Sequence, residues 1–221
     1  MTTQDQILRY IRSKVSRAYF EEIRNAVPIA FKKAHDASLS LVNTSRDRYR
    51  SQGRYYFLQD GLADLVTSWS PEVKSTNPPG EFYTLMTAAN VKVTAAVKPW
   101  KKKIRPAKYR INNSKLNKFL SAPQLDLLDQ KDKNLIPEET LNAIIIPLSP
   151  PAHMDPAAPL SIIIAVPYFN SCVDYHVWFE LDKFISGYET DEETQVEVDD
   201  GVWPIVRQRM RRDEDGQADN E

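Results

Sequence analysis

The sequence predicts an α+β fold, in which an N-terminal helical region precedes a mainly antiparallel sheet. Three observations support this class. Apolar residues recur at helical spacing in the first 70 residues, β-like runs begin at Phe82, and a segment rich in proline, from Pro71 to Gly80, separates the two regions. Runs of helices followed by runs of strands are typical of α+β proteins rather than of alternating parallel sheets.

The 221 residues are enough for one sizeable core but not for two full domains. We therefore expect a single domain over residues 1–212, with a helical part at about 4–70 and a sheet part at about 82–185. Residues 213–221 contain almost no apolar side chain and are predicted to form a disordered acidic tail.

The helical region begins with apolar residues four positions apart, which line one face of a helix. These residues are Ile7, Ile11, Val15, Tyr19 and Ile23. The pattern predicts a long helix over 4–26 that ends near Pro28, and further helices over 29–45 and 46–69.

The sheet region is predicted to open with a hairpin, whose strands run from Phe82 to Thr87 and from Val91 to Val97. A short helix is expected over 114–130. Strands at 142–148, 160–168 and 172–181 follow, the last two joined by a tight turn at Asn170 and Ser171. Pro204 opens a final predicted helix over 203–212.

Several classes of function find no support in the composition. The longest apolar runs, such as Ala143–Pro147, are far shorter than the ~20 residues of a membrane-spanning helix, and residues 1–6 do not resemble a secretory signal, so we expect a cytoplasmic protein without membrane contact. The lone Cys172 is expected to be a structural thiol. Scattered glycines and widely separated histidines predict neither a cofactor nor a metal site.

Charge is distributed very unevenly along the chain. Residues 1–118 contain 22 Lys or Arg and 9 Asp or Glu, whereas residues 119–221 contain 7 and 21, so the formal net charges are +13 and −14. Ten of the cations fall between Lys92 and Lys118, and no acidic residue occurs between Glu81 and Asp126. Such asymmetry is typical of a polyanion-binding surface, of an acidic interaction segment, or of both.

Within this stretch, cations alternate with aromatic residues, and two prolines favour an extended or turning backbone. An extended basic segment can follow a phosphate backbone while its aromatic side chains stack on bases. A second basic patch lies between Arg46 and Arg54. The candidate nucleic-acid-binding residues are Lys98, Trp100, Lys101, Lys102, Lys103, Arg105, Lys108, Tyr109, Arg110, Arg50 and Arg54.

The leading hypothesis is therefore a non-enzymatic nucleic-acid-binding or regulatory protein, with DNA or RNA as the partner. The competing reading for these cations is a solvated loop that the acidic half neutralises. A second hypothesis is a protein-interaction or inhibitor module that uses the acidic region Glu189–Asp200; the two-sign surface also permits homo-oligomers.

A third hypothesis is a metal-dependent nuclease built from Asp64 with Glu72 and Lys74, or from Asp126 with Asp129 and Lys131. His176, with Asp174 and Glu180 on the same face of its strand, resembles a polar cluster more than a catalytic base.

Overall fold

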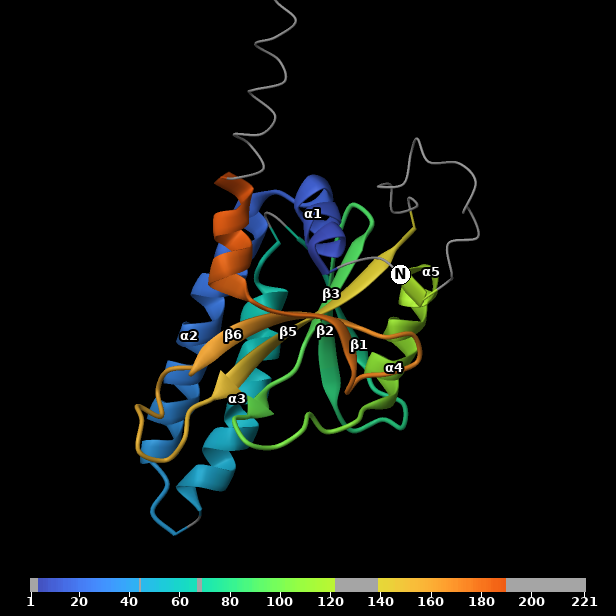
Figure 1. Ribbon diagram of the computed structural model, residues 1–221. Helices are drawn as coiled ribbons and strands as arrows, with labels where there is room; N and C mark the ends of the chain where they lie inside the picture. The colour runs from blue at the N-terminus through green and yellow to red at the C-terminus, as the bar shows by residue number, and fades with distance from the viewer. Residues whose placement is uncertain (1–3, 44, 67–68, 122–138, 190–221) are drawn as a thin grey trace, which may run out of the picture. The chain divides into compact units, whose positions relative to one another are not determined.

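The structure is a computed structural model that describes residues 4–43, 45–66, 69–121 and 139–189. It confirms the α+β class, with an N-terminal helical region followed by a mostly antiparallel sheet (Figure 1). The predicted acidic tail and the predicted helix at 203–212 lie outside the described residues. The helices are α1 (Gln4–Lys14), α2 (Arg17–Leu39), α3 (Arg46–Ala63), α4 (Lys108–Ser114), the 3₁₀ helix η1 (Lys115–Asn117), α5 (Lys118–Ser121) and a further helix over 181–189. The strands are β1 (Ser70–Ser75), β2 (Phe82–Ala88), β3 (Val91–Ala95), β4 (Lys98–Pro99), β5 (Leu141–Ser149), β6 (Ser161–Pro167) and β7 (Tyr175–Glu180).

The strands form one mixed sheet in the order β1-β2-β3-β5-β6-β7, and β4 continues the line of β3 along β5. All neighbours are antiparallel except that β3 and β4 run parallel to β5. A parallel pair requires a crossover, and here the crossover passes through α4, η1 and α5. These short helices lie on the opposite side of the sheet from α2 and α3 (Figure 1).

The strand register separates the side chains of the sheet onto two faces. We call one face the long-helix face, because Thr84, which points to the same side of β2 as Met86, donates a hydrogen bond to Gln59 of α3. This face carries mainly apolar residues. The short-helix face lies toward α4, because Tyr83 stacks on Tyr109. The long-helix face bears Met86, Val93, Ala95, Ala143, Ile145 and Ile164, and the short-helix face bears Leu85, Thr94, Ile144, Ile146, Ile163, Ala165 and Trp178.

The helical region departs from the predicted boundaries at two places. The predicted helix over 4–26 is broken at Ser16, whose ψ of 155° is extended, and this residue caps the second helix. That second helix, α2, then runs through Pro28 to Leu39, so the prediction of an end near Pro28 was wrong. Pro28 is exposed, while Val27, Ala30 and Phe31 around it are fully buried, and their packing offsets the one lost backbone hydrogen bond.

Helices α2 and α3 pack against each other at close range. A Cβ added at Gly53 of α3 would meet the Cβ of Ala34 of α2 at 3.4 Å, so two small residues allow this approach. Trp69 stands edge-on to Phe20 and donates from Nε1 to the Tyr19 carbonyl at 3.1 Å, which ties the start of β1 to α2. No helix in the described part of the chain is both long and apolar enough to cross a bilayer.

In the sheet region, the predicted hairpin and the three later strands are confirmed within a few residues. Strand β1 was not predicted, because Pro71 and its polar neighbours read as a helix-ending loop; it pairs at the edge of the sheet, where proline is tolerated. The short helix predicted over 114–130 is α4, η1 and α5 up to residue 121, beyond which the prediction lies outside the described residues.

Candidate nucleic-acid interface

The basic segment after β3 has a backbone that the sheet holds at several points. Lys98 and Pro99 pair with Leu148 and Ser149 of β5, and the Lys102 amide donates to the Pro99 carbonyl at 3.2 Å to close a turn. Ile104, only 4% exposed, packs into an apolar cluster on the short-helix face. The cluster also contains Ala96, Ile144, Ile146, Ile163 and Ala165. Burial of a single isoleucine thus anchors the middle of a highly charged loop.

Five cations of this segment face solvent. The side chains of Lys101, Lys102, Lys103, Arg105 and Lys108 are all exposed. Among the described residues, ion pairs form between Arg17 and Glu21, Arg24 and Asp182, Arg50 and Asp47, Lys74 and Glu72, and Lys183 and Glu180. None of these pairs includes a cation of the 98–108 segment, so no carboxylate of the described chain neutralises it.

Two tryptophans accompany the cations. Trp100 is 45% exposed, and the Nζ of Lys101 lies 5.4 Å from the centroid of its indole. The Nζ of Lys98 lies 5.7 Å from the ring of Trp178, a residue of β7 that is 38% exposed. Both distances fall within the range of cation–π attraction. Trp178 was not among the predicted residues, because it lies far from Lys98 in the sequence and approaches it only in the folded sheet.

Tyr109 and Arg110 form a staple at the start of α4. Arg110 is only 6% exposed; its Nη1 donates to the Tyr109 hydroxyl at 2.7 Å, and its Nη2 donates to the carbonyl of Arg105. The Tyr109 ring stacks on Tyr83 of β2, with centroids 4.0 Å apart and planes 13° apart. Although both residues were predicted to contact nucleic acid, the structure uses them to fold the basic segment back onto the sheet.

Burial raises the pKa of Tyr55, and the neighbouring Tyr109 hydroxyl raises it further. Tyr55 donates to the carbonyl of Phe82 at 2.6 Å. This hydroxyl is therefore a neutral donor that joins α3 to the beginning of β2, and it has no acid–base role at neutral pH.

The two arginines predicted on α3 are engaged within the protein. Arg54 is 6% exposed, donates to the Pro156 carbonyl at 2.6 Å, and lies 4.8 Å from the ring centroid of Phe31. Burial, followed by the charge of Arg50, lowers the pKa of Arg54 to about 10, so the guanidinium stays charged at neutral pH. Arg50 pairs with Asp47 and approaches His35 Nδ1 at 3.4 Å. The exposed candidates are thus confined to the segment around Lys98–Lys108.

A buried polar patch lies beneath α4 on the short-helix face. The side chain of Asn117 in η1 accepts a hydrogen bond from the backbone N–H of Asn142 at 2.8 Å. It also donates to the backbone carbonyls of Asn142 and Pro167 at 3.0 and 2.8 Å. The side chain of Asn117 thus joins η1 to the backbones of β5 and β6 and gives the Pro167 carbonyl a hydrogen-bond donor. Beside it, the side chains of Asn142 and Thr94 are fully buried, and their polar atoms have no hydrogen-bond partner. No sequence pattern indicated this patch.

Among the described residues, those predicted for other chemistries are not gathered into a site. Glu72 and Lys74 pair with each other on edge strand β1 at 2.9 Å, apart from any third ligand. Glu180 of β7 pairs with Lys183, and His176 of the same strand packs on the Tyr168 ring. Asp174, which precedes the strand, lies near the Ser171 hydroxyl. Within residues 4–121 and 139–189, the described ranges hold no group of three His, Cys, Asp or Glu that is placed to bind a metal ion.

The other partners predicted from the sequence involve residues that are mostly beyond description. Of the acidic region Glu189–Asp200, only Glu189 lies in the described chain. Asp126, Asp129 and Lys131 all lie outside the described residues. The protein-interaction hypothesis stays a prediction.

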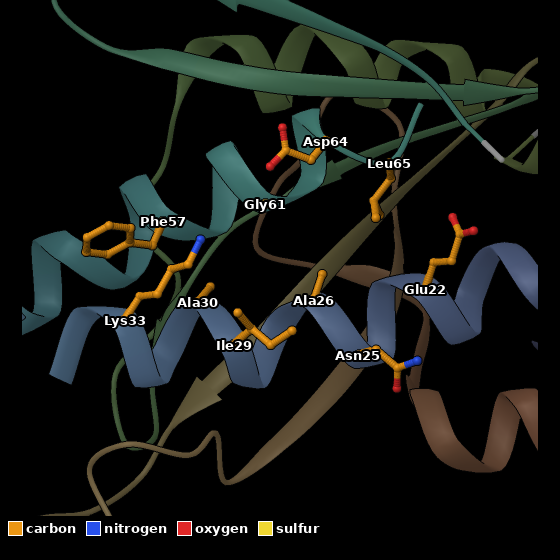
Figure 2. A pocket seen from close by; sticks show the side chains of 10 residues that line it. All are labelled: Glu22, Asn25, Ala26, Ile29, Ala30, Lys33, Phe57, Gly61, Asp64 and Leu65. Carbon is orange, nitrogen blue, oxygen red and sulfur yellow. The ribbon is translucent and has the colours of Figure 1, made fainter. Parts of the chain in front are cut away.

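A groove of about 330 Å³ between α2 and α3 is the second candidate site (Figure 2). Its floor is apolar, with Ala26, Ala30 and Leu65, and Lys33 points from α2 toward α3 near Phe57. Glu22 and Asp64 add two carboxylates to this lining. Because carboxylates outnumber the single lysine, the groove does not suit a phosphate backbone.

The exposed basic segment is therefore the surface best suited to a polyanion. Comparison of the chain with protein-family models, curated proteins and solved structures gives no match, so its chemistry has to be inferred from these residues alone.

Proposed function

We propose that this protein binds nucleic acid through phosphate contacts of the segment Lys98–Lys108. One observation carries the proposal: five exposed cations lie close together in sequence, on the loop before α4 and at its first residue, and no carboxylate of the described chain pairs with them. Unpaired surface cations break no ion pair of the protein when they meet phosphates, and the counterions released from the nucleic acid favour binding.

The way the loop is held supports the same function. The turn at Pro99, the buried Ile104 and the bond from Arg110 to the carbonyl of Arg105 fix the backbone, while the charged side chains project outward. Phosphate contacts of this kind position a protein on nucleic acid but read no sequence. We therefore expect binding that depends steeply on salt and weakly on base sequence.

The experiment compares two triple variants that remove the same charge. One is Lys101→Ala, Lys102→Ala, Lys103→Ala; the control is Lys32→Ala, Lys33→Ala, Arg48→Ala, three exposed cations of α2 and α3. Binding to labelled 20-residue DNA and RNA oligonucleotides is measured across a salt series. The first variant should weaken binding at least about tenfold on every sequence and lower the salt slope by roughly 2 to 3, since each phosphate contact contributes about 0.9.

The control variant should bind within about twofold of the parent protein. An unchanged affinity in the lysine variant, or an equal loss in the control, would remove the proposed function.

A further inference from the structure

We infer that the nucleic acid bound here is single-stranded, with unpaired bases stacking on the indoles of Trp100 and Trp178. The inference rests on the proposed function and specifies its ligand. It draws on a part of the interface that phosphate contacts do not use, namely aromatic surface exposed next to the cations.

Trp178 is a partly exposed indole on a strand of the sheet, on which a base could stack. It lies opposite Ala165 on β7, over the side of the sheet that carries the apolar cluster of Ile144 and Ile163. The Tyr175 ring packs beside it, with centroids 5.0 Å apart at 56°, and 38% of its own surface stays exposed. An indole that is flanked by Tyr175 and partly exposed can offer its exposed surface to a base.

Trp100 supplies the second surface, and Lys98 connects the two. The Nζ of Lys98 lies 3.4 Å from the carbonyl oxygen of Trp100 and 5.7 Å from the ring of Trp178. One ammonium group therefore lies near the backbone of Trp100 and the ring of Trp178, where it can contact a phosphate of a strand that stacks on these indoles. Lys101, 5.4 Å from the Trp100 ring, extends the same alternation of cation and aromatic group.

The alternation of cations and aromatic rings should favour single-stranded over double-stranded nucleic acid. In a duplex the base faces are covered by their neighbours, so the indoles would have only edges and sugars to contact, and the lysines alone would contribute. In a single strand every base has a face available, and stacking on an aromatic side chain strengthens binding by about tenfold per base with little dependence on sequence. Exposed aromatic residues among cations on a sheet are suited to unpaired bases in this way.

The test uses the full chain, a labelled 20-nucleotide oligo(dT) strand and a labelled 20-base-pair duplex. The double variant Trp100→Leu, Trp178→Leu keeps apolar cover over the sheet but cannot stack. It should lose at least about tenfold in affinity for the single strand and stay within about twofold of the parent on the duplex. The variant Trp100→Phe, Trp178→Phe restores an aromatic face and should recover most of the loss.

Phe82→Leu serves as the matched control, because Phe82 is 58% exposed but lies at the start of β2, outside this segment. It should leave both affinities unchanged. Melting curves of each variant establish that a loss in binding does not come from unfolding. If the double leucine variant fails to fold, the single variant Trp100→Leu, which lies outside the strands, carries the test: it should weaken binding to the single strand and leave binding to the duplex unchanged.

The outcomes separate the two proposals. If the leucine variant binds the single strand as well as the parent does, while the Lys101–Lys103 variant still weakens binding, the stacking inference is overturned and the proposed function survives. Equal losses on strand and duplex would also overturn it. If the parent protein binds neither probe at low salt, the proposed function itself fails, and the inference with it.

Discussion

The two faces of the sheet treat their polar side chains in opposite ways. On the long-helix face, the Thr84 hydroxyl donates to the Gln59 carbonyl at 2.8 Å, and the Thr84 amide donates to Gln59 Oε1 at 2.7 Å. On the short-helix face, Thr94 and Asn142 are equally buried, yet their side-chain polar atoms have no partner. The same residue type, threonine, is thus satisfied on one face and unsatisfied on the other.

This contrast suggests that the two faces of the sheet have different roles, one in stability and the other in supporting the basic segment. The apolar residues of the long-helix face are almost fully buried, and hydrogen bonds from Thr84 to α3 complete this face, so substitutions there should mainly affect stability. The short-helix face tolerates buried polar atoms, each of which costs about 1–3 kcal/mol, and it supports the exposed basic segment. We therefore expect variants to affect stability or binding according to the face they touch.

The largest effect should follow from Phe20→Ala, on the long-helix side. Phe20 is fully buried, with its ring 5.7 Å from Trp69 and 4.8 Å from Phe184. The cavity left by the ring should lower the free energy of unfolding by about 3–5 kcal/mol, measured by urea denaturation. Nucleic-acid affinity, measured at 10 °C where the variant remains folded, should not change. A matching loss of affinity would contradict the separate roles of the two faces.

Arg54→Ala should lower the free energy of unfolding by about 2 kcal/mol, because Pro156 loses a charged hydrogen-bond donor and Phe31 loses its cation. Arg48→Ala, which removes an exposed cation of the same helix, is the control and should change stability by less than about 0.5 kcal/mol. Both are measured by urea denaturation. If Arg54→Ala reduced binding without reducing stability, Arg54 would belong to the interface after all.

The sharpest test of the comparison is a pair of identical substitutions. Thr84→Val removes a hydroxyl that is hydrogen-bonded, and should destabilise the fold by about 1 kcal/mol. Thr94→Val removes a hydroxyl that has no partner, and should stabilise the fold by about 1 kcal/mol. Thermal and urea unfolding of both variants would give the two signs, and a loss of stability in Thr94→Val would break the comparison.

The smallest effect concerns pH. Burial lowers the pKa of His176, so the unfolded chain binds this proton more readily than the folded chain does. Stability should therefore fall as the pH drops through the unfolded value of about 6.5, and the loss should stop growing below the folded pKa. In His176→Phe, which keeps a ring against Tyr168, the decrease between pH 7.5 and 5 should be smaller. An identical decrease in both proteins would exclude this role for His176.

Sequence patterns predicted the elements better than they predicted the environment of each residue. Apolar spacing located the helices and the later strands, because periodic burial is visible in one dimension. The end of the first helix was missed, since the apolar spacing continues across the break at Ser16, and the burial of Val27, Ala30 and Phe31 around Pro28 depends on tertiary packing. Strand β1 was missed because its pairing with β2 comes from tertiary structure, not from its own propensity.

The candidate site shows the same limit. The exposed lysines were found as a local cluster, which needs no knowledge of the fold. Arg54 and Arg110 belong to the same clusters in sequence but point inward, toward Pro156 and toward Arg105, and only the packing of distant segments decides this. Trp178 was missed for the converse reason, because it comes from a strand nearly 80 positions after Lys98 and meets it only in the folded sheet.

The staple formed by Arg110, Tyr109 and Tyr83 affects the rate at which this loop binds a ligand and the conformational entropy that binding costs. A flexible basic loop would pay about 1–2 kcal/mol of conformational entropy for each residue that binding immobilises. Here Arg110 already holds the backbone of Arg105, and the tyrosine stack already holds α4, so only the rotamers of the lysine side chains remain to be ordered. An anion arriving at this loop meets a preorganised backbone, and association should proceed without a slow folding step.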